Sequence, residues 1–314
     1  DTGLMIGYNS TFLNEQNSAN GYTEWTDVND LGSIFVFEPV TDFTSVIDVP
    51  AAKTAAIAEL NNLATFSVIY PATTEAVAAI EAVTAAGTGI AELDAAIEAI
   101  NKIVADYKVS ALKALNGKYF TLHSAGCDKF VEVSNSVVAA VQTVNTPAAY
   151  WQFVENEGYV NVYNPYTGKY LCATPFGQSV ALTEEKANAC KYDVEVVVNN
   201  ETSEVRFLLN DGSYLHVNGT LLTWYDGGSS RWTLTEAKDF STMISSYKTS
   251  TLATLDQWAT LSVVFDASLI ENAKAAINAI NTTDFATFAA IDAEIKEVTD
   301  AVAAKMFTFQ TTAN

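Results

Sequence analysis

The sequence predicts a multidomain α and β protein, in which all-β modules alternate with Ala-rich three-helix bundles. Two observations favour this fold class. Distant stretches of the 314-residue chain match at a nearly fixed offset, which is typical of a repeat. Within one repeat the hydrophobic pattern changes from helical spacing to short strand-like runs, so each repeat is expected to hold two kinds of domain.

The long repeat is visible in matching landmarks along the chain. Ser33 matches Ser230, and Asp42 matches Asp239, with an offset of 197 residues in both cases. Leu60 matches Leu255, 195 residues later. Near the end, Tyr119-Phe120-Thr121-Leu122 matches Met306-Phe307-Thr308-Phe309 at an offset of 187, which predicts a somewhat shorter second helical region followed by a new strand.

Helical spacing dominates the stretch from Ala51 to Leu115 and its counterpart from Asp239 to Ala304. Apolar residues there recur every three or four positions, a stripe that lines one face of a helix; the clearest run is Ile90, Leu93, Ile97, Ile100 and Val104. Pro71 and the Gly87–Gly89 stretch divide the first region into three expected helices. Asn116-Gly117 supplies a left-handed stop.

The stretch from Lys118 to Glu236 consists of short runs rich in Val, Tyr, Phe and Thr, which is typical of an all-β domain. A pair of strands recurs three times within it. Each copy closes on an aromatic residue two positions before an apolar one, at Trp151, Tyr192 and Trp232, with spacings of 41 and 40 residues. Three lobes that each close on an aromatic residue predict a pseudo-threefold β-trefoil.

At these residues the chain resembles the ricin-type trefoil lectins. The similar features are the run Gly168-Lys169-Tyr170-Leu171-Cys172 and the closing Trp-x-aromatic or Trp-x-Leu strand, over roughly Gly117 to Ala237. The family has Gln two positions before each closing Trp, and this chain has Ala149, Cys190 and Ser230 instead. The resemblance also implies a disulfide between Cys172 and Cys190, which leaves Cys127 single and favours an oxidising, extracellular or cell-surface setting.

These patterns predict five segments in order. They are a C-terminal lobe of a partial β-trefoil at 1–42, a helical bundle at 43–116, a complete β-trefoil at 117–238, a second helical bundle at 239–304, and the first strand of a further β-trefoil at 305–314. The chain would then be one window on a longer repeat array. With no Gly/Ser-rich or Pro-rich linker at the junctions, the modules are expected to stack stiffly.

Sugar recognition requires an aromatic face for the apolar side of a pyranose and a carboxylate or amide for its hydroxyls. The best candidates for carbohydrate binding are Trp224, Tyr225 and Asp226, before the Gly227-Gly228 turn. Further candidates are Tyr163, Asn164 and Tyr166, and Asp128 beside Phe130. In the alternative interpretation, Tyr166 and Trp224 cover the trefoil base or pack against the adjoining bundle.

Several functional classes are disfavoured by composition. The net charge of −21 repels phosphate backbones and anionic lipids, and no apolar run approaches the roughly 18 residues of a spanning helix, so neither nucleic acid nor membrane insertion is expected. No cofactor loop, metal-binding histidine pair or nucleophile elbow is present, and His123 and His216 favour packed or hydrogen-bonded roles. We therefore expect no enzyme and no cofactor. Paired carboxylates for glycoside hydrolysis stay possible, but no second feature points to them.

Two functions follow from the sequence. In the first, the protein is an extracellular repeat protein whose lectin-like trefoils bind carbohydrate weakly and multivalently, as in adhesion. In the second, it is a purely structural stalk or filament in which the trefoils are spacers. The expected partners are glycans or neighbouring copies of the same repeat.

Overall fold

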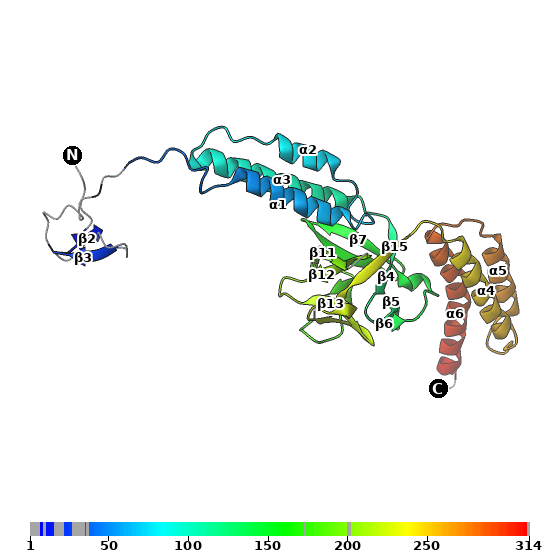
Figure 1. Ribbon diagram of the computed structural model, residues 1–314. Helices are drawn as coiled ribbons and strands as arrows, with labels where there is room; N and C mark the ends of the chain where they lie inside the picture. The colour runs from blue at the N-terminus through cyan, green and yellow to red at the C-terminus, as the bar shows by residue number, and fades with distance from the viewer. Residues whose placement is uncertain are drawn as a thin grey trace. The chain divides into compact units, whose positions relative to one another are not determined.

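The structure, a computed structural model shown in Figure 1, describes residues 7–8, 11–15, 22–26, 35, 38–172, 174–199 and 202–312. The chain divides into two compact units. The first comprises Asp1–Ala52 with Val83–Ala99, and the second comprises Lys53–Ala82 with Ile100–Asn314. Helices and a large antiparallel sheet are both present, so the architecture is mixed.

The first unit contains a small antiparallel sheet. Its strands β1 (Gly7–Tyr8), β2 (Thr11–Glu15) and β3 (Tyr22–Trp25) pair in the order β1-β2-β3. Farther on, the Asp42 carboxylate accepts hydrogen bonds from the backbone N–H and hydroxyl of Thr44, at 3.0 and 2.7 Å. The assignment of residues 1–42 to a trefoil lobe stays a prediction, since most of this segment lies outside the described residues.

Six α-helices occur in the described part of the chain, in two groups of three. They are α1 (Val49–Ala64), α2 (Thr74–Ala82), α3 (Ile90–Lys113), α4 (Ser241–Ala259), α5 (Ala267–Ala279) and α6 (Ala286–Thr312). The apolar positions of each stripe are buried, as Leu60, Ile80 and Ile100 are in the first group and Leu255, Ile277 and Phe288 in the second. None of the helices in the described residues is long and apolar enough to span a membrane.

The strand predicted for residues 305–314 is wrong as far as this segment is described. Helix α6 continues through Thr312, while Ala313 and Asn314 lie outside the described residues. The physical reason is local, because the segment directly follows Ala-rich helical sequence and includes Lys305 and Met306, which are good helix formers.

The large sheet consists of strands between Tyr119 and Ala237. Among the described residues its strands are β4 (Tyr119–Ser124), β5 (Lys129–Ser134), β6 (Val137–Val141), β7 (Tyr150–Asn156), β8 (Tyr159–Asn164), β9 (Lys169–Cys172), β10 (Ala181–Thr183), β11 (Asp193–Asn199), β12 (Thr202–Leu208), β13 (Tyr214–Asn218), β14 (Thr220–Trp224) and β15 (Trp232–Ala237). All of their pairings are antiparallel.

Six of these strands form a closed ring. β4 pairs with β7, β7 with β8, β11 with β12, β12 with β15, and β15 returns to β4. The remaining step, from β8 to the start of β11, is a bridge between Val160 and Tyr192 with reciprocal hydrogen bonds of 2.9 Å. Closing the ring satisfies the backbone groups that an open sheet would leave unpaired at its edges.

The ring contains three equivalent pairs. Phe120 lies opposite Trp151, Val160 opposite Tyr192, and Val205 opposite Trp232, and all six side chains are buried. Trp151 and Trp232 donate their indole N–H groups to the carbonyls of Val131 and Leu215, at 3.0 and 3.1 Å. The three closing aromatic residues identified in the sequence therefore occupy equivalent positions around one core.

Candidate functional site

Three aromatic side chains contact one another on the surface of the sheet and form what we call the aromatic platform: Phe176, Trp224 and Tyr225. Their exposed fractions are 41%, 41% and 66%. The Phe176 and Trp224 rings stack at 4.9 Å between centroids with 17° between their planes, and Tyr225 lies 4.5 Å from Phe176. The platform thus presents aromatic surface to solvent.

The platform joins two turns that are far apart in sequence. Trp224 ends β14, whereas Phe176 lies in the turn before β10. The Gly177 N–H donates to the carbonyl of Thr223 at 2.9 Å, and the Thr223 hydroxyl donates to the carbonyl of Pro175 at 3.3 Å. Gly177 has φ of +78°, and a Cβ there would lie 3.0 Å from Trp224 Cζ3, so glycine permits both the turn and the close approach.

A charged group borders the platform. Arg206 donates from Nη1 to Asp226 Oδ2 at 2.6 Å and pairs through Nη2 with Glu195 Oε2 at 2.8 Å. Its guanidinium also lies over the Tyr214 ring, 5.0 Å from the centroid. The Asp226 side chain, next to Tyr225 in sequence, is therefore oriented and is still 41% exposed.

The loop after the platform is anchored by His216. The Ser230 hydroxyl donates to the carbonyl of Tyr225 at 2.9 Å. Because that hydrogen is used, His216 Nδ1 donates its own hydrogen to the Ser230 hydroxyl oxygen, at 2.8 Å. Partial burial lowers the pKa of His216, which favours its neutral form. The loop thus holds Tyr225 with a hydrogen-bonded histidine, as the sequence led us to expect for this residue.

Two residues of the second predicted cluster, Asn164 and Tyr166, are engaged in contacts within the protein. Asn164 is fully buried; its amide donates to the carbonyls of Ala148 and Tyr150, and its oxygen accepts from Thr167. Tyr166 contacts the second bundle through its hydroxyl, 3.1 Å from that of Tyr247. These contacts agree with the alternative interpretation for Tyr166, and they leave Asn164 no exposed polar atom for a ligand.

The other predicted candidates lie away from the platform residues in the sheet. The Tyr163 ring packs against Tyr170, with centroids 4.6 Å apart. Asp128 Oδ1 accepts a hydrogen bond from His123 Nε2 at 2.9 Å, and the Asp128 side chain is 82% exposed. Phe176, by contrast, was missed by the sequence reasoning, although the Pro175-Phe176-Gly177 turn could have marked it as an exposed aromatic residue.

The predicted disulfide between Cys172 and Cys190 is wrong for this structure, where no disulfide occurs among the described residues. Backbone bonds close the lobe instead, since the Cys190 N–H donates to Leu171 at 2.9 Å and the Asn161 amide donates to the Cys190 carbonyl at 2.6 Å. Burial raises the pKa of the Cys190 thiol to about 11, which favours the protonated thiol. Cys127 is partly buried.

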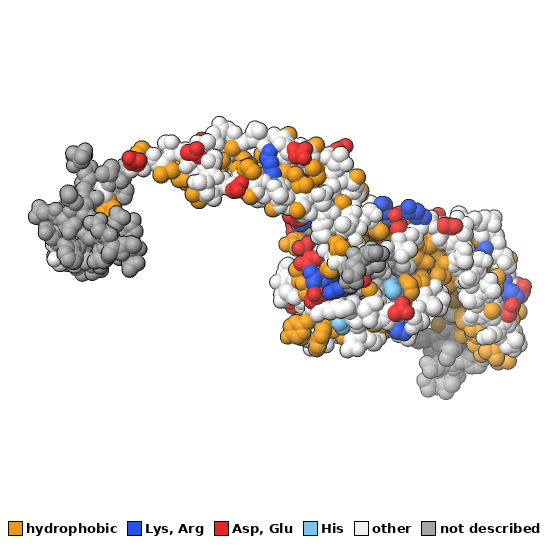
Figure 2. Space-filling model, viewed as in Figure 1, with side chains coloured by type: hydrophobic (Ala, Val, Ile, Leu, Met, Phe, Trp, Pro, Cys, Tyr) orange, Lys and Arg blue, Asp and Glu red, His pale blue; other side chains and the backbone are white. Residues whose placement is uncertain are grey.

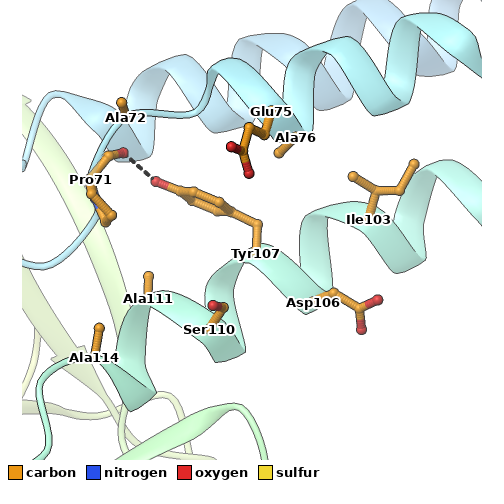
Figure 3. Close-up of a pocket in the computed structure, with 10 residues that line it drawn as sticks. All are labelled: Pro71, Ala72, Glu75, Ala76, Ile103, Asp106, Tyr107, Ser110, Ala111 and Ala114. Atoms are coloured by element: carbon orange, nitrogen blue, oxygen red, sulfur yellow. Dashed lines mark hydrogen bonds between the residues drawn. The ribbon is translucent and has the colours of Figure 1, made fainter.

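A pocket of about 400 Å³ lies between α2 and α3, within the second unit (Figure 3). Small side chains such as Ala72, Ala76 and Ala111 line it around the Tyr107 ring. Two of its polar side chains are engaged with neighbours, because the Tyr107 hydroxyl donates to the Pro71 carbonyl at 2.6 Å and Asp106 pairs with Lys102. Among the residues that the structure describes, Glu75 and Ser110 are its other polar side chains, and no aromatic ring besides Tyr107 lines it.

A shallow hollow of about 690 Å³ lies where the large sheet meets α4 and α6. Its floor includes Tyr119 and Phe285, whose stacked rings are 4.5 Å apart, and charged residues such as Lys238 and Asp284 border it. Among the described residues no group of His, Cys, Asp and Glu could hold a metal ion. The aromatic platform is therefore the strongest candidate site.

No family model and no curated protein sequence matches the chain. Solved structures that are similar to it include a GlcNAcα1-4Gal-releasing endo-β-galactosidase from Clostridium perfringens, with 17% identity over 39% of this chain and a TM-score of 0.34. Two others are SeviL bound to asialo-GM1 saccharide, with 17% identity over 38% of this chain and TM-score 0.33, and the Polyporus squamosus lectin bound to Neu5Acα2-6Galβ1-4GlcNAc, with 16% identity over 39% and TM-score 0.32.

The matched region spans 33% of the galactosidase chain, 98% of SeviL and 50% of the Polyporus lectin. Each match thus covers less than half of the present chain, while the covered share of the other protein ranges from 33% to 98%. At these identities and TM-scores, the likeness assigns neither a ligand nor an activity to this chain.

Proposed function

We propose that residues 117–238 form a β-trefoil of the ricin-type kind and that its aromatic platform binds carbohydrate. The trefoil assignment is supported by the closed ring of six strands and by its three equivalent aromatic pairs. The binding role is supported by the platform itself. Trp224 and Tyr225, two of the residues that the sequence predicted, belong to it, Phe176 joins them from a neighbouring turn, and Asp226 follows Tyr225 in sequence.

One observation carries the proposal, namely that three large aromatic rings remain exposed while in contact with one another. Exposed aromatic surface of this kind marks binding sites more often than isolated apolar residues do. The axial hydrogens of a pyranose pack against a flat ring, and Trp offers the largest ring for that contact. Asp226, held by Arg206, supplies carboxylate oxygens for the sugar hydroxyls.

The affinity of one site is expected to be low. The platform is a surface and not an enclosed pocket, so it covers one face of a sugar and leaves most of the ligand in water. A dissociation constant on the order of a millimolar corresponds to a binding free energy of about −4 kcal/mol, which a single stacking contact with a few hydrogen bonds can supply. Multivalency across repeated modules would then raise the overall affinity.

A sugar titration tests the proposal. Methyl glycosides of galactose, glucose, mannose and N-acetylglucosamine are added while tryptophan fluorescence is followed, and at least one is expected to change the emission of the exposed Trp224. Trp224→Ala, whose binding is followed by calorimetric titration because it lacks the reporting tryptophan, should bind about tenfold more weakly or worse. Tyr159→Ala, which removes a 36% exposed aromatic side chain outside the platform, serves as the matched control and should bind normally. Binding that survives Trp224→Ala would refute the site.

A second function is favoured by the contact between the sheet and the second bundle. Tyr119, Tyr150 and Tyr166 of the sheet pack with the apolar core of α4, α5 and α6. Such a core suits a stiff structural stalk or filament in which the trefoil is a spacer. If no sugar changes the tryptophan fluorescence in the titration and electron micrographs show ordered fibres, this function would be favoured over carbohydrate binding.

The proposal also covers the location of the protein and its repeat architecture. We infer a non-catalytic binding role in an extracellular or cell-surface repeat protein, in which trefoils alternate with helical bundles. The support is the 195- to 197-residue repeat in the sequence and the order of elements along the chain, in which three helices precede the strands of the large sheet and three follow them. Surface labelling of intact cells that produce the protein would test the location.

A further inference from the structure

The first helix of each bundle ends in a loop with the same apolar pattern. We call residues 65–70 loop A and residues 260–265 loop B. Loop A reads Thr-Phe-Ser-Val-Ile-Tyr, and loop B, 195 residues later, reads Thr-Leu-Ser-Val-Val-Phe. Every large apolar position of loop A is therefore apolar in loop B.

The two loops also have the same backbone hydrogen bonds. In loop A the N–H groups of Ile69 and Tyr70 both donate to the Phe66 carbonyl, at 3.1 and 3.0 Å. In loop B, Val264 and Phe265 both donate to the Leu261 carbonyl, at 2.9 and 3.0 Å. The opening threonine of each loop donates its hydroxyl to the carbonyl three residues earlier, at 2.7 Å in both cases. Loop B thus already has the conformation of loop A.

Loop A contacts strand β11 of the large sheet. The Tyr70 hydroxyl donates to the carbonyl of Val194 in β11 at 3.2 Å, and the nearby Asn62 amide donates to Val196 at 3.5 Å. Phe66, Ile69 and Tyr70 are exposed by only 5%, 2% and 1%. Within the second unit, loop A therefore packs next to strand β11.

Loop B exposes the side chains that match Phe66, Val68 and Ile69, of which Val68 is itself 36% exposed in loop A. Leu261, Val263 and Val264 are exposed by 54%, 97% and 42%. They are adjacent, and Phe265 beside them is held by stacking on Trp258 at 4.8 Å and 6°. Figure 2 shows hydrophobic side chains at the end of the bundle where Figure 1 places the turn between α4 and α5. A contiguous apolar patch on a formed loop is typical of an interaction surface.

We propose that loop B is a docking surface for another strand-rich body of the kind formed by β4 to β15. It would cover that partner's equivalent of β11 as loop A covers β11 here. The contact is heterologous, because loop and strand are different surfaces, so it joins modules head to tail. This inference is independent of the sugar site, which lies at Phe176, Trp224 and Tyr225.

The test uses the full chain as its own partner. Within one copy loop A covers β11 and competes with any second molecule at high effective concentration, so the unaltered chain is expected to be monomeric. Tyr70→Asp removes the bond to Val194 and places a carboxylate near Asp193 and Glu59, which repels loop A from the sheet. With β11 uncovered, loop B of another copy should bind there, and sedimentation should show the average mass rising at least about twofold with concentration.

Second variants decide which surface is responsible. Adding Val263→Asp to Tyr70→Asp should weaken association by about tenfold or more, because it puts a charge into the apolar contact. Adding Val46→Asp instead, which alters a 78% exposed valine in a different turn, should leave association unchanged. A Tyr70→Asp chain that stays monomeric with native circular dichroism, or association that Val263→Asp leaves intact, would overturn the proposal. If Tyr70→Asp loses its native circular dichroism, Tyr70→Ala replaces it in the same comparison.

Discussion

Individual residues of the sheet show how a surface site depends on backbone geometry. Trp224 and Phe176 can stack because Gly177 brings its turn within van der Waals contact of the indole. A glycine is needed there for two reasons, its left-handed φ and the space that a Cβ would occupy. Gly168 has a similar φ of +72° but open space where a Cβ would lie. Comparing Gly168 with Gly177 therefore separates the effect of the left-handed φ from the effect of the close approach to Trp224.

Gly177→Ala is expected to destabilise the protein by about 1 kcal/mol or more and to weaken sugar binding, because the new methyl group displaces the Trp224 ring. Gly168→Ala should cost a similar backbone penalty without altering binding. Chemical denaturation measures the first effect, and the fluorescence titration measures the second. Equal binding by both variants would show that the close approach of Gly177 to Trp224 is unimportant.

The buried thiol of Cys190 leads to a prediction about pH. An unfolded thiol ionises near pH 9, whereas the folded protein holds the Cys190 proton until about pH 11. As pH rises through this window the unfolded state loses its proton first, so the free energy of unfolding should fall, by at most about 1.4 kcal/mol per pH unit. Cys190→Ala should reduce this slope between pH 9 and 11, and Cys127→Ala should not; urea denaturation at each pH provides the measurement.

At the scale of elements, the sequence predicted some features and missed others for identifiable physical reasons. Trp151, Tyr192 and Trp232 were predictable as equivalent core residues because aromatic spacing directly reflects the threefold core. The helical course of residues 305–312 was not, since Phe307-Thr308-Phe309 has a strand-like pattern although it directly follows Ala-rich helical sequence. Phe176 was missed because its contact with Trp224 joins turns 48 residues apart, which no local pattern records.

The matched loops offer a paired test of burial at this scale. Ile69→Asp in loop A should destabilise the protein by about 3 kcal/mol or more, since it buries a charge without a partner. Val264→Asp at the equivalent position of loop B, where the side chain is 42% exposed, should cost less than about 1 kcal/mol. Thermal denaturation compares them, and equal losses would contradict the difference in exposure between the two loops.

For the whole molecule, the decisive feature is that the large sheet and the second bundle share a core. The rings of Tyr119 and Tyr150 from the sheet each lie 5.2 Å from Phe240, which directly precedes α4. The Tyr247 hydroxyl also donates to Asp292 at 2.6 Å while contacting Tyr166, so polar and apolar contacts join the same two bodies. Their unfolding should therefore be coupled in the unaltered protein.

Phe240→Ala should break that coupling. Removing this buried ring is expected to cost about 3 to 5 kcal/mol and to remove one of the two bundle rings that contact both Tyr119 and Tyr150, which leaves only Phe285. Calorimetry should then show two transitions, with the helices unfolding before the sheet. Phe288→Ala is the control, because Phe288 is equally buried but its ring contacts are with Phe240, Tyr247 and Phe285 on the bundle side. If Phe240→Ala retains a single transition that is merely shifted to lower temperature, the shared aromatic core is not what couples the two bodies.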